Sequence, residues 1–176
     1  MVSQAEVVTR RVVIADAGPL IALARIEKLD LLRELFGFIW ITRAVCREIF
    51  PDGASFADEG PLYRSLIDGW VYVVDSPPST YATLNPGIDE GEASAIQTAY
   101  VWRESGEKVL LVMDDRAGRR EATRVGITII GTAGVIGLAK TQGLIPSARP
   151  LLNSLIASGY FIGSNIVAAV LRQLGE

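Results

Sequence analysis

The sequence predicts an α/β protein in which helices cover both faces of a mostly parallel sheet. The short runs 12–15 and 109–113 are aliphatic throughout, as strands buried on both faces are. Helical segments alternate with such runs along the chain, a pattern typical of βαβ units. The 176 residues, of which 49% are hydrophobic, are enough to bury a core. We therefore expect one domain, 1–176, with an N-terminal extension at 1–10 and a C-terminal helical extension at 145–176.

Short helices are expected after each strand in the first half of the chain. Gly18-Pro19 directly follows the first strand and places proline in the first turn of a helix, where its fixed φ is favourable. Thr42 is the expected N-cap of the helix after the second strand. The expected elements are a strand at 12–16, helices at 20–24 and 29–36, a strand at 38–41, and helices at 42–49 and 57–68.

The second half continues the alternation and then ends in helices. Prolines and glycines predict a loop at 75–87, and Thr132 is the expected N-cap of the helix after the last strand. The expected elements are a strand at 70–74, a helix at 89–104, a strand at 108–113, a helix at 115–125, a strand at 127–130, and helices at 132–141, 147–158 and 164–174.

The composition excludes several kinds of chemistry. The chain has no histidine, which excludes Ser-His-Asp and Cys-His catalysis and histidine-ligated zinc or iron sites. Because Cys46 is the single cysteine, a thiolate metal site is excluded as well. A metal ion would be held by oxygen atoms, which favours Mg²⁺ or Mn²⁺. The net charge of −3 gives no overall attraction to nucleic acid, so RNA binding would need a local basic patch.

The location of the protein is also constrained by the sequence. No apolar run approaches the roughly 18 residues that a bilayer-spanning helix needs. Residues 1–6 lack the basic start and apolar core of a signal peptide. A lone cysteine makes no internal disulfide, which fits a reducing compartment. We expect a cytoplasmic protein that does not associate with membranes.

Two aspartates follow the two apolar runs. Asp16 ends the first run and Asp114 ends the second, and ligands of parallel sheets gather beyond the carboxyl ends of the strands. Two carboxylates about 4–5 Å apart repel by on the order of 3 kcal/mol at an effective dielectric near 20, and a cation between them removes this repulsion. The alternative for Asp16 is an N-cap, worth about 1 kcal/mol.

Two glutamates extend this acidic set. Glu92 lies three and four residues before Ala95 and Ile96, on the apolar face of its helix, where a buried carboxylate needs a partner. The alternative is a first-turn glutamate that the helix dipole favours. Glu48 follows apolar positions at helical spacing but could equally be a solvated surface residue. Asp89 is expected to cap the helix of Glu92 and to take no further part.

A basic stripe begins beside Asp114. Arginines at four-residue spacing form one face of the expected helix at 115–125, and contact with phosphates is the functional interpretation. Pairing with Glu121 and Asp115 on a solvated face is the alternative. The stripe consists of Arg116, Arg120 and Arg124, and Arg119 lies on the same helix. Gly131-Thr132-Ala133-Gly134 lacks the spacing of the glycine-rich nucleotide-binding loops.

These motifs together resemble the PIN-domain family. The matching segments are Asp16-Ala17-Gly18-Pro19-Leu20-Ile21, Glu48, Asp89-Glu90-Gly91-Glu92-Ala93, Asp114-Asp115, Gly131-Thr132-Ala133-Gly134 and residues 139–145. More narrowly, the sequence is similar to a branch of VapC-like toxins that is often catalogued as a domain of unknown function. The resemblance covers roughly residues 11–174, nearly the whole chain.

The resemblance implies a three-layer α/β/α fold and a metal-dependent ribonuclease, the toxin of a type II toxin–antitoxin pair. It assigns Asp16, Glu48, Glu92 and Asp114 to a cluster that binds one or two Mg²⁺ or Mn²⁺ ions. It also implies a homodimer and a small antitoxin protein as partner. Many members carry aspartate at the position of Glu92, which leaves the number of ions open.

The remaining candidate residues have supporting roles in this interpretation. Asp115 is an accessory acid, and Thr132 is a candidate for orienting a water molecule or a substrate phosphate. Arg116, Arg119 and Arg120 are the candidate substrate-binding residues.

Two other functions compete with the nuclease. One is a catalytically silent PIN-like scaffold or partner-binding module. The other is a receiver-like phosphoacceptor, which the Asp114-Asp115 doublet, Thr132 and Lys140 loosely resemble. The late position of the doublet argues against a receiver, since that fold needs it after the first strand.

Overall fold

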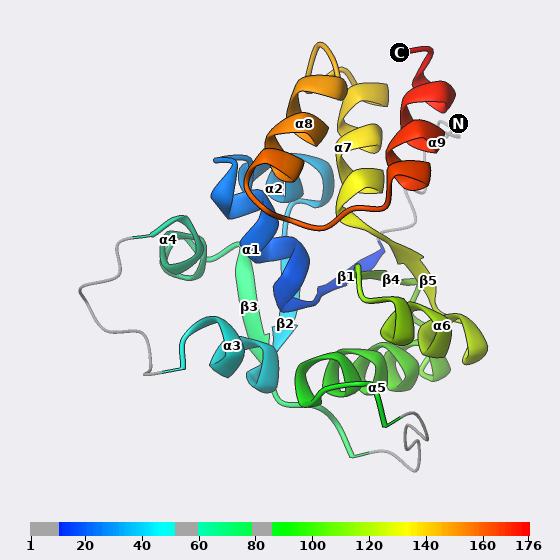
Figure 1. Ribbon diagram of the computed structural model, residues 1–176. Coiled ribbons are helices and arrows are strands. Elements are labelled where there is room, and N and C mark those ends of the chain that lie inside the picture. The colour runs from blue at the N-terminus through cyan, green and yellow to red at the C-terminus, as the bar shows by residue number, and fades with distance from the viewer. Residues whose placement is uncertain (1–10, 52–59, 79–85) are drawn as a thin grey trace, which may run out of the picture.

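The computed structural model describes residues 11–51, 60–78 and 86–176. Within them, five strands form one sheet in which every neighbouring pair is parallel, in the order β3-β2-β1-β4-β5 (Figure 1). The expectation of a mostly parallel sheet is confirmed. The strands are β1 (Val12–Ala15), β2 (Ile39–Thr42), β3 (Val71–Val74), β4 (Val109–Val112) and β5 (Thr128–Ile130).

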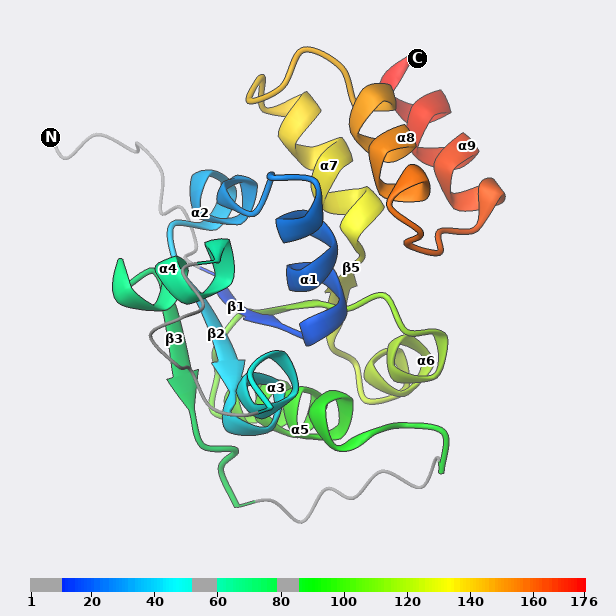
Figure 2. The same ribbon diagram turned by 60° about the vertical axis from the view of Figure 1, so that its left-hand side comes forward.

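Helices cover both faces of this sheet and give a three-layer α/β/α arrangement, as predicted. Helices α5 and α6 lie on one face, and α1, α2, α7 and α8 lie on the other, with α9 against α7 (Figures 1 and 2). The described helices are α1 (Ala17–Arg25), α2 (Asp30–Phe36), α3 (Arg43–Ile49), α4 (Pro61–Ile67), α5 (Glu90–Glu104), α6 (Arg116–Arg124), α7 (Thr132–Thr141), α8 (Arg149–Ala157) and α9 (Ser164–Leu174).

The central strands divide their side chains between two hydrophobic cores. Val13 and Ala15 of β1 pack with α1, α7 and α8, whereas Ile14 packs with α5 on the opposite face. Strand β4 alternates in the same way and is buried along its whole length. Ile14 and Leu111 are direct neighbours across the β1–β4 pair. The uniformly apolar runs in the sequence therefore arise because both faces of these strands are covered.

The ends of several elements differ slightly from the prediction. Thr42 caps α3 as expected, its side chain accepting a hydrogen bond from the backbone N–H of Val45. Thr132 does not cap α7: Gly131 is the N-cap residue, and Thr132 lies inside the first turn with its hydroxyl directed to Asp114. The N-cap prediction for Thr132 was therefore wrong, because a tertiary partner takes its side chain.

Three predicted features lie wholly or partly outside the described residues. They are the extension at 1–10, the start of the helix predicted at 57–68, and part of the loop predicted at 75–87. The described part of that helix begins at Pro61, with proline in its first turn. None of the helices in the described residues combines the length and hydrophobicity that crossing a bilayer requires.

The two C-terminal helices are part of the hydrophobic core. Leu152 and Leu155 of α8 are fully buried, and Leu171 of α9 is nearly so. Glu176 at the C-terminus accepts hydrogen bonds from the backbone N–H groups of Ala148 and Arg149, at 2.9 and 3.1 Å, where α8 begins. This contact ties Glu176, just beyond the end of α9, to the start of α8.

Candidate active site at the carboxyl edge of the sheet

A solvent-open cavity of about 1320 Å³ lies at the carboxyl edge of the sheet. In the strand order, β2 and β3 lie on one side of the central pair β1–β4, and β5 lies on the other. The order of the strands therefore reverses between β1 and β4, and ligands of open α/β sheets bind at such a switch point. Acids from the ends of β1 and β4 meet there with acids from α3 and α5. The acids that line the cavity are Asp16, Glu48, Asp89, Glu92, Asp114 and Asp115.

Asp16 is a buried carboxylate that lacks a full set of partners. Its residue is 6% exposed, and its Oδ1 atom has no hydrogen-bond partner among the described residues. Burial raises its pKa from 3.8 to about 7, opposed by the backbone N–H of Ala17 and reinforced by the charges of Glu48, Glu92 and Asp89. The side chain makes no capping hydrogen bond to α1, so a helix cap does not account for it.

Glu92 lies both on the buried face and in the first turn of α5, the two positions that its interpretations require. It lies on the buried face of α5 and is 8% exposed, and its Oε2 atom accepts a hydrogen bond of 3.1 Å from the backbone N–H of Asp89. Asp89 returns the bond through its Oδ1 atom, which completes a capping box. Burial raises the pKa of Glu92 to about 7, opposed by that N–H and reinforced by Asp89, Asp115 and Glu48.

Asp89 and Glu48 belong to the same acidic wall. Asp89 caps α5 as predicted, but it also lines the cavity and repels the neighbouring acids, which the sequence did not indicate. The Glu48 side chain is exposed, in agreement with its surface alternative, and it nevertheless lines the cavity. Partial burial and the charge of Asp89 raise the pKa of Glu48.

Asp114 is held by donors from two other elements. Its Oδ1 atom accepts the backbone N–H of Thr132 at 2.9 Å, and its Oδ2 atom accepts the Thr132 hydroxyl and the Tyr160 hydroxyl, the latter at 2.7 Å. Tyr160 lies between α8 and α9, and nothing in the sequence indicated it. Burial and the adjacent Asp114 charge raise the pKa of the Tyr160 phenol. Asp115 is exposed and caps α6 through Gly118.

Glycines provide the space for these carboxylates. A Cβ atom at Gly131 would lie 2.6 Å from Oδ1 of Asp114, and one at Gly91 would lie 2.7 Å from Oε2 of Glu48. A Cβ atom at Gly18 would lie 3.4 Å from the Tyr160 hydroxyl and 3.9 Å from Oδ2 of Asp16. Gly131 and Gly91 therefore leave the room that the carboxylates of Asp114 and Glu48 need, whereas at Gly18 a Cβ atom would make only ordinary contacts.

The arginine stripe divides between the cavity and the surface. Arg116, Arg119 and Arg120 line the cavity, and Arg119 donates a hydrogen bond of 2.9 Å to the carbonyl oxygen of Met113. Arg116 and Arg120 form no ion pair in the part of the chain that the structure describes. Arg124 pairs with Glu121 at 2.7 Å, so the pairing alternative holds for this arginine.

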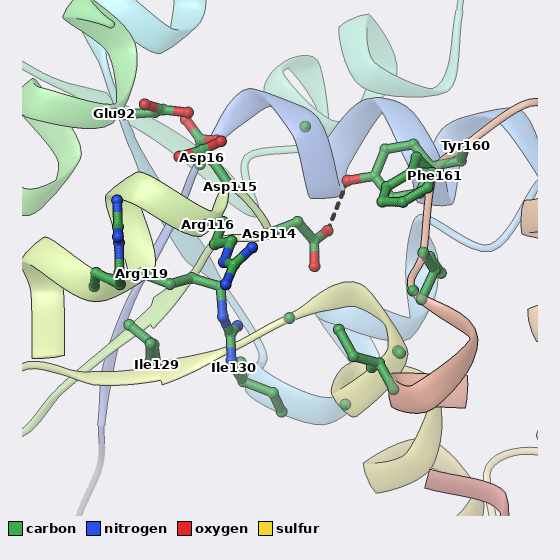
Figure 3. A pocket seen from close by; sticks show the side chains of 18 of the residues that line it. Asp16, Glu92, Asp114, Asp115, Arg116, Arg119, Ile129, Ile130, Tyr160 and Phe161 are labelled. Atoms are coloured by element: carbon green, nitrogen blue, oxygen red, sulfur yellow. Dashed lines mark hydrogen bonds between the residues drawn. The ribbon is translucent and has the colours of Figure 1, made fainter. Parts of the chain in front are cut away.

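Figure 3 shows how the groups are distributed. Asp16, Glu92 and Asp115 lie together on one side of the view, Tyr160 and Phe161 lie on the other, and Asp114 is between them. Tyr160 and Phe161 come from the connection between α8 and α9, far in sequence from the acids. The cavity thus offers carboxylates, unpaired arginines and aromatic side chains to one ligand.

The fold and the cavity define an α/β protein with a carboxylate site at the switch point of a parallel sheet. A family model described as a PIN domain matches residues 12–176, and the chain belongs to this family, as its motifs predicted. PIN domains are generally nucleases and generally use divalent metal ions. No protein with a curated description matches the sequence.

The residues present fit a hard divalent cation in their chemistry. All candidate ligands are carboxylates, and the buried Oδ1 atom of Asp16, which has no hydrogen-bond partner among the described residues, would gain a partner in a bound cation. Across residues 11–51, 60–78 and 86–176, no three acids stand close enough together to form a ready-made metal site. Binding by three or more carboxylates would therefore require side-chain movement.

Proposed function

We propose that the protein is a divalent-metal-dependent endoribonuclease that hydrolyses RNA phosphodiester bonds. The observation that carries this proposal is the buried Oδ1 atom of Asp16, which has no hydrogen-bond partner among the described residues and lies on the wall of a cavity that Arg116 and Arg120 also line. A buried carboxylate that lacks a partner is costly, and a cation bound against it offsets that cost. The motifs further support a role as the toxin of a type II toxin–antitoxin pair.

In this proposal, four acids would hold the cation, namely Asp16, Glu48, Glu92 and Asp114. When bound, Mg²⁺ or Mn²⁺ supplies activation of water and neutralisation of the charge that develops on the phosphate. The mechanism requires no histidine base, which suits a chain without histidine.

The other residues of the cavity would position the reacting groups. Thr132 and Tyr160 hold the Asp114 carboxylate in one orientation through their hydrogen bonds. Arg116 and Arg120 carry positive charge into the same cavity and would offset the repulsion between the acids and an RNA backbone. Arg119 would assist them, while Asp115 would add negative charge beside Glu92.

The biological setting proposed here rests on the resemblance of the motifs. It consists of a cytoplasmic homodimer that a small antitoxin protein silences. The single-domain organisation over 1–176, with extensions at 1–10 and 145–176, belongs to the same proposal.

A second candidate function is a PIN-like partner-binding module without catalysis. One observation favours it: within the described residues the acids form no ready-made group of three, and Asp114 already accepts three hydrogen bonds. Such a module would bind its partner or RNA without cleaving it.

Cleavage of total RNA by purified protein, in Mn²⁺ or in EDTA, tests the proposal. We expect cleavage in Mn²⁺ and none in EDTA. Asp16→Asn is expected to abolish cleavage while leaving the fold intact, because it removes a ligand charge and relieves repulsion from the neighbouring acids. The matched control is Asp30→Asn, at an exposed aspartate in the first turn of α2. RNA binding without cleavage in Mn²⁺ would contradict the nuclease and support the silent module.

A further inference from the structure

Phe161 is the most exposed large hydrophobic residue of the described chain. It is 91% exposed, although it lines the same cavity as Asp16 and Asp114. A large apolar side chain beside a charged cavity is a marker of an interaction site. Because so little of its surface is buried, Phe161 contributes little to the stability of the fold.

The position of Phe161 is fixed by the residue before it. Tyr160 donates its hydroxyl to Asp114 at 2.7 Å, and consecutive Cα atoms are about 3.8 Å apart. The backbone of Phe161 therefore directly follows a residue whose side chain is held at Asp114. Figure 3 shows both aromatic side chains on the same segment, on the opposite side of Asp114 from Asp16 and Glu92.

The remaining walls of the cavity indicate the chemistry of its ligand. Arg116 and Arg120 of α6 supply unpaired positive charge. Apolar side chains lie around the same opening, at Ile129, Ile130, Ile162, Ile166 and Val170. Positive charge and an exposed aromatic ring on the walls of one cavity are the combination that binds single-stranded nucleic acid, where arginines contact phosphates and rings stack on bases.

We infer that Phe161 is a substrate-recognition residue whose ring stacks on an unpaired base of the bound RNA. This inference rests on the proposed function and assigns a residue to substrate binding. Bases in a duplex are covered on both faces by their neighbours and offer no free face to a ring, whereas bases in loops and single strands do. Duplex RNA can still contact the arginines but gains nothing from Phe161.

Binding of a short oligoribonucleotide that carries 2-aminopurine tests this inference, in EDTA so that the strand stays intact. The variants are Phe161→Ala, Phe161→Leu and Phe161→Trp. The matched control is Ile67→Ala on α4, which removes a 69% exposed side chain outside the cavity. The same sequence in a duplex is the comparison ligand.

We expect Phe161→Ala to bind the single strand about 5- to 150-fold more weakly, the loss that removal of one stacked base produces. Phe161→Leu is expected to lose a similar factor, because it keeps apolar surface but has no ring, and Phe161→Trp is expected to bind at least as tightly as the wild type. Fluorescence of 2-aminopurine is expected to be quenched by the wild type and by Phe161→Trp. The duplex is expected to bind all variants equally.

Several results would overturn stacking. Wild-type affinity in Phe161→Ala would show that the ring does not bind RNA and would point to a protein partner instead. Wild-type affinity in Phe161→Leu would show an apolar contact that needs no aromatic ring. An equal loss for single strand and duplex would show a contact with the backbone. Failure of the proposed function is distinguishable, since it appears in the wild type as absent cleavage in Mn²⁺, whereas failure of stacking appears only in the ratios between variants.

Discussion

Asp16→Asn is expected to stabilise the metal-free protein at neutral and alkaline pH. Burial raises the pKa of Asp16 from 3.8 to about 7, so the folded state holds this proton more tightly than the unfolded state does. At about 1.4 kcal/mol for each tenfold change in proton affinity, the difference corresponds to about 4 kcal/mol. This is the free energy by which folding disfavours the ionised form of Asp16 relative to its protonated form, and asparagine, which carries no charge, does not incur it.

The sign of the pH dependence follows from proton uptake. Between pH 3.8 and about 7 the folded state binds more protons at Asp16 than the unfolded state, so stability falls as the pH rises through this window. The advantage of Asp16→Asn over the wild type is therefore expected to grow by about 2.5 kcal/mol between about pH 5 and about pH 8. Below pH 3.8 both states are protonated and the difference from ionisation disappears.

Urea unfolding of both proteins in EDTA across this pH range measures the effect. Asp30→Asn, which removes an exposed aspartate outside the cavity, is the control and is expected to show no such growth. Added Mg²⁺ is expected to stabilise the wild type more than Asp16→Asn, because the variant lacks the charge that the cation would neutralise. Identical pH profiles for wild type and Asp16→Asn would refute the reasoning.

Two further changes test the geometry of the cavity. Gly131→Ala places a methyl group 2.6 Å from Oδ1 of Asp114, which displaces this carboxylate; we expect a loss of about 1–3 kcal/mol in urea unfolding and a strong loss of RNA cleavage. Replacing Arg116 and Arg120 together by alanine removes two unpaired cavity charges. RNA affinity is expected to weaken, and the slope of log K against log salt for single strands is expected to flatten by about 1.4.

Each of these variants has a control in the same chain. A Cβ atom at Gly60, which like Gly131 is the N-cap residue of its helix, would meet nothing within 4 Å among the described residues, so Gly60→Ala is expected to cost much less than Gly131→Ala. Arg124 pairs with Glu121, so Arg124→Ala is expected to leave the salt slope unchanged. Equal destabilisation by both glycine variants would show that the cavity geometry does not cause the loss. An unchanged slope in the double arginine variant would remove Arg116 and Arg120 from RNA binding.

The sequence by itself predicted the layers of this protein because its signals are local. Uniform apolar runs such as 109–113 are typical of strands covered on both faces, and a proline after the first strand marks the start of a helix. The carboxyl ends of β1 and β4 follow from those runs, so the meeting of Asp16 and Asp114 in one cavity was predictable. Helical spacing alone predicted that Glu92 lies on the buried face of its helix.

Only the tertiary structure decided how these acids are partnered. Thr132 is a residue type typical of N-caps, yet its hydroxyl donates to Asp114 and Gly131 takes the N-cap position. Asp89 has the sequence of a simple cap, yet its charge acts on Asp16. Tyr160 and Phe161 reach the cavity because α8 and α9 pack on α7, and a contact between residues 46 positions apart in sequence leaves no periodic or local signal. Local patterns thus set the scaffold and the acids, and long-range packing set their partners and the aromatic wall.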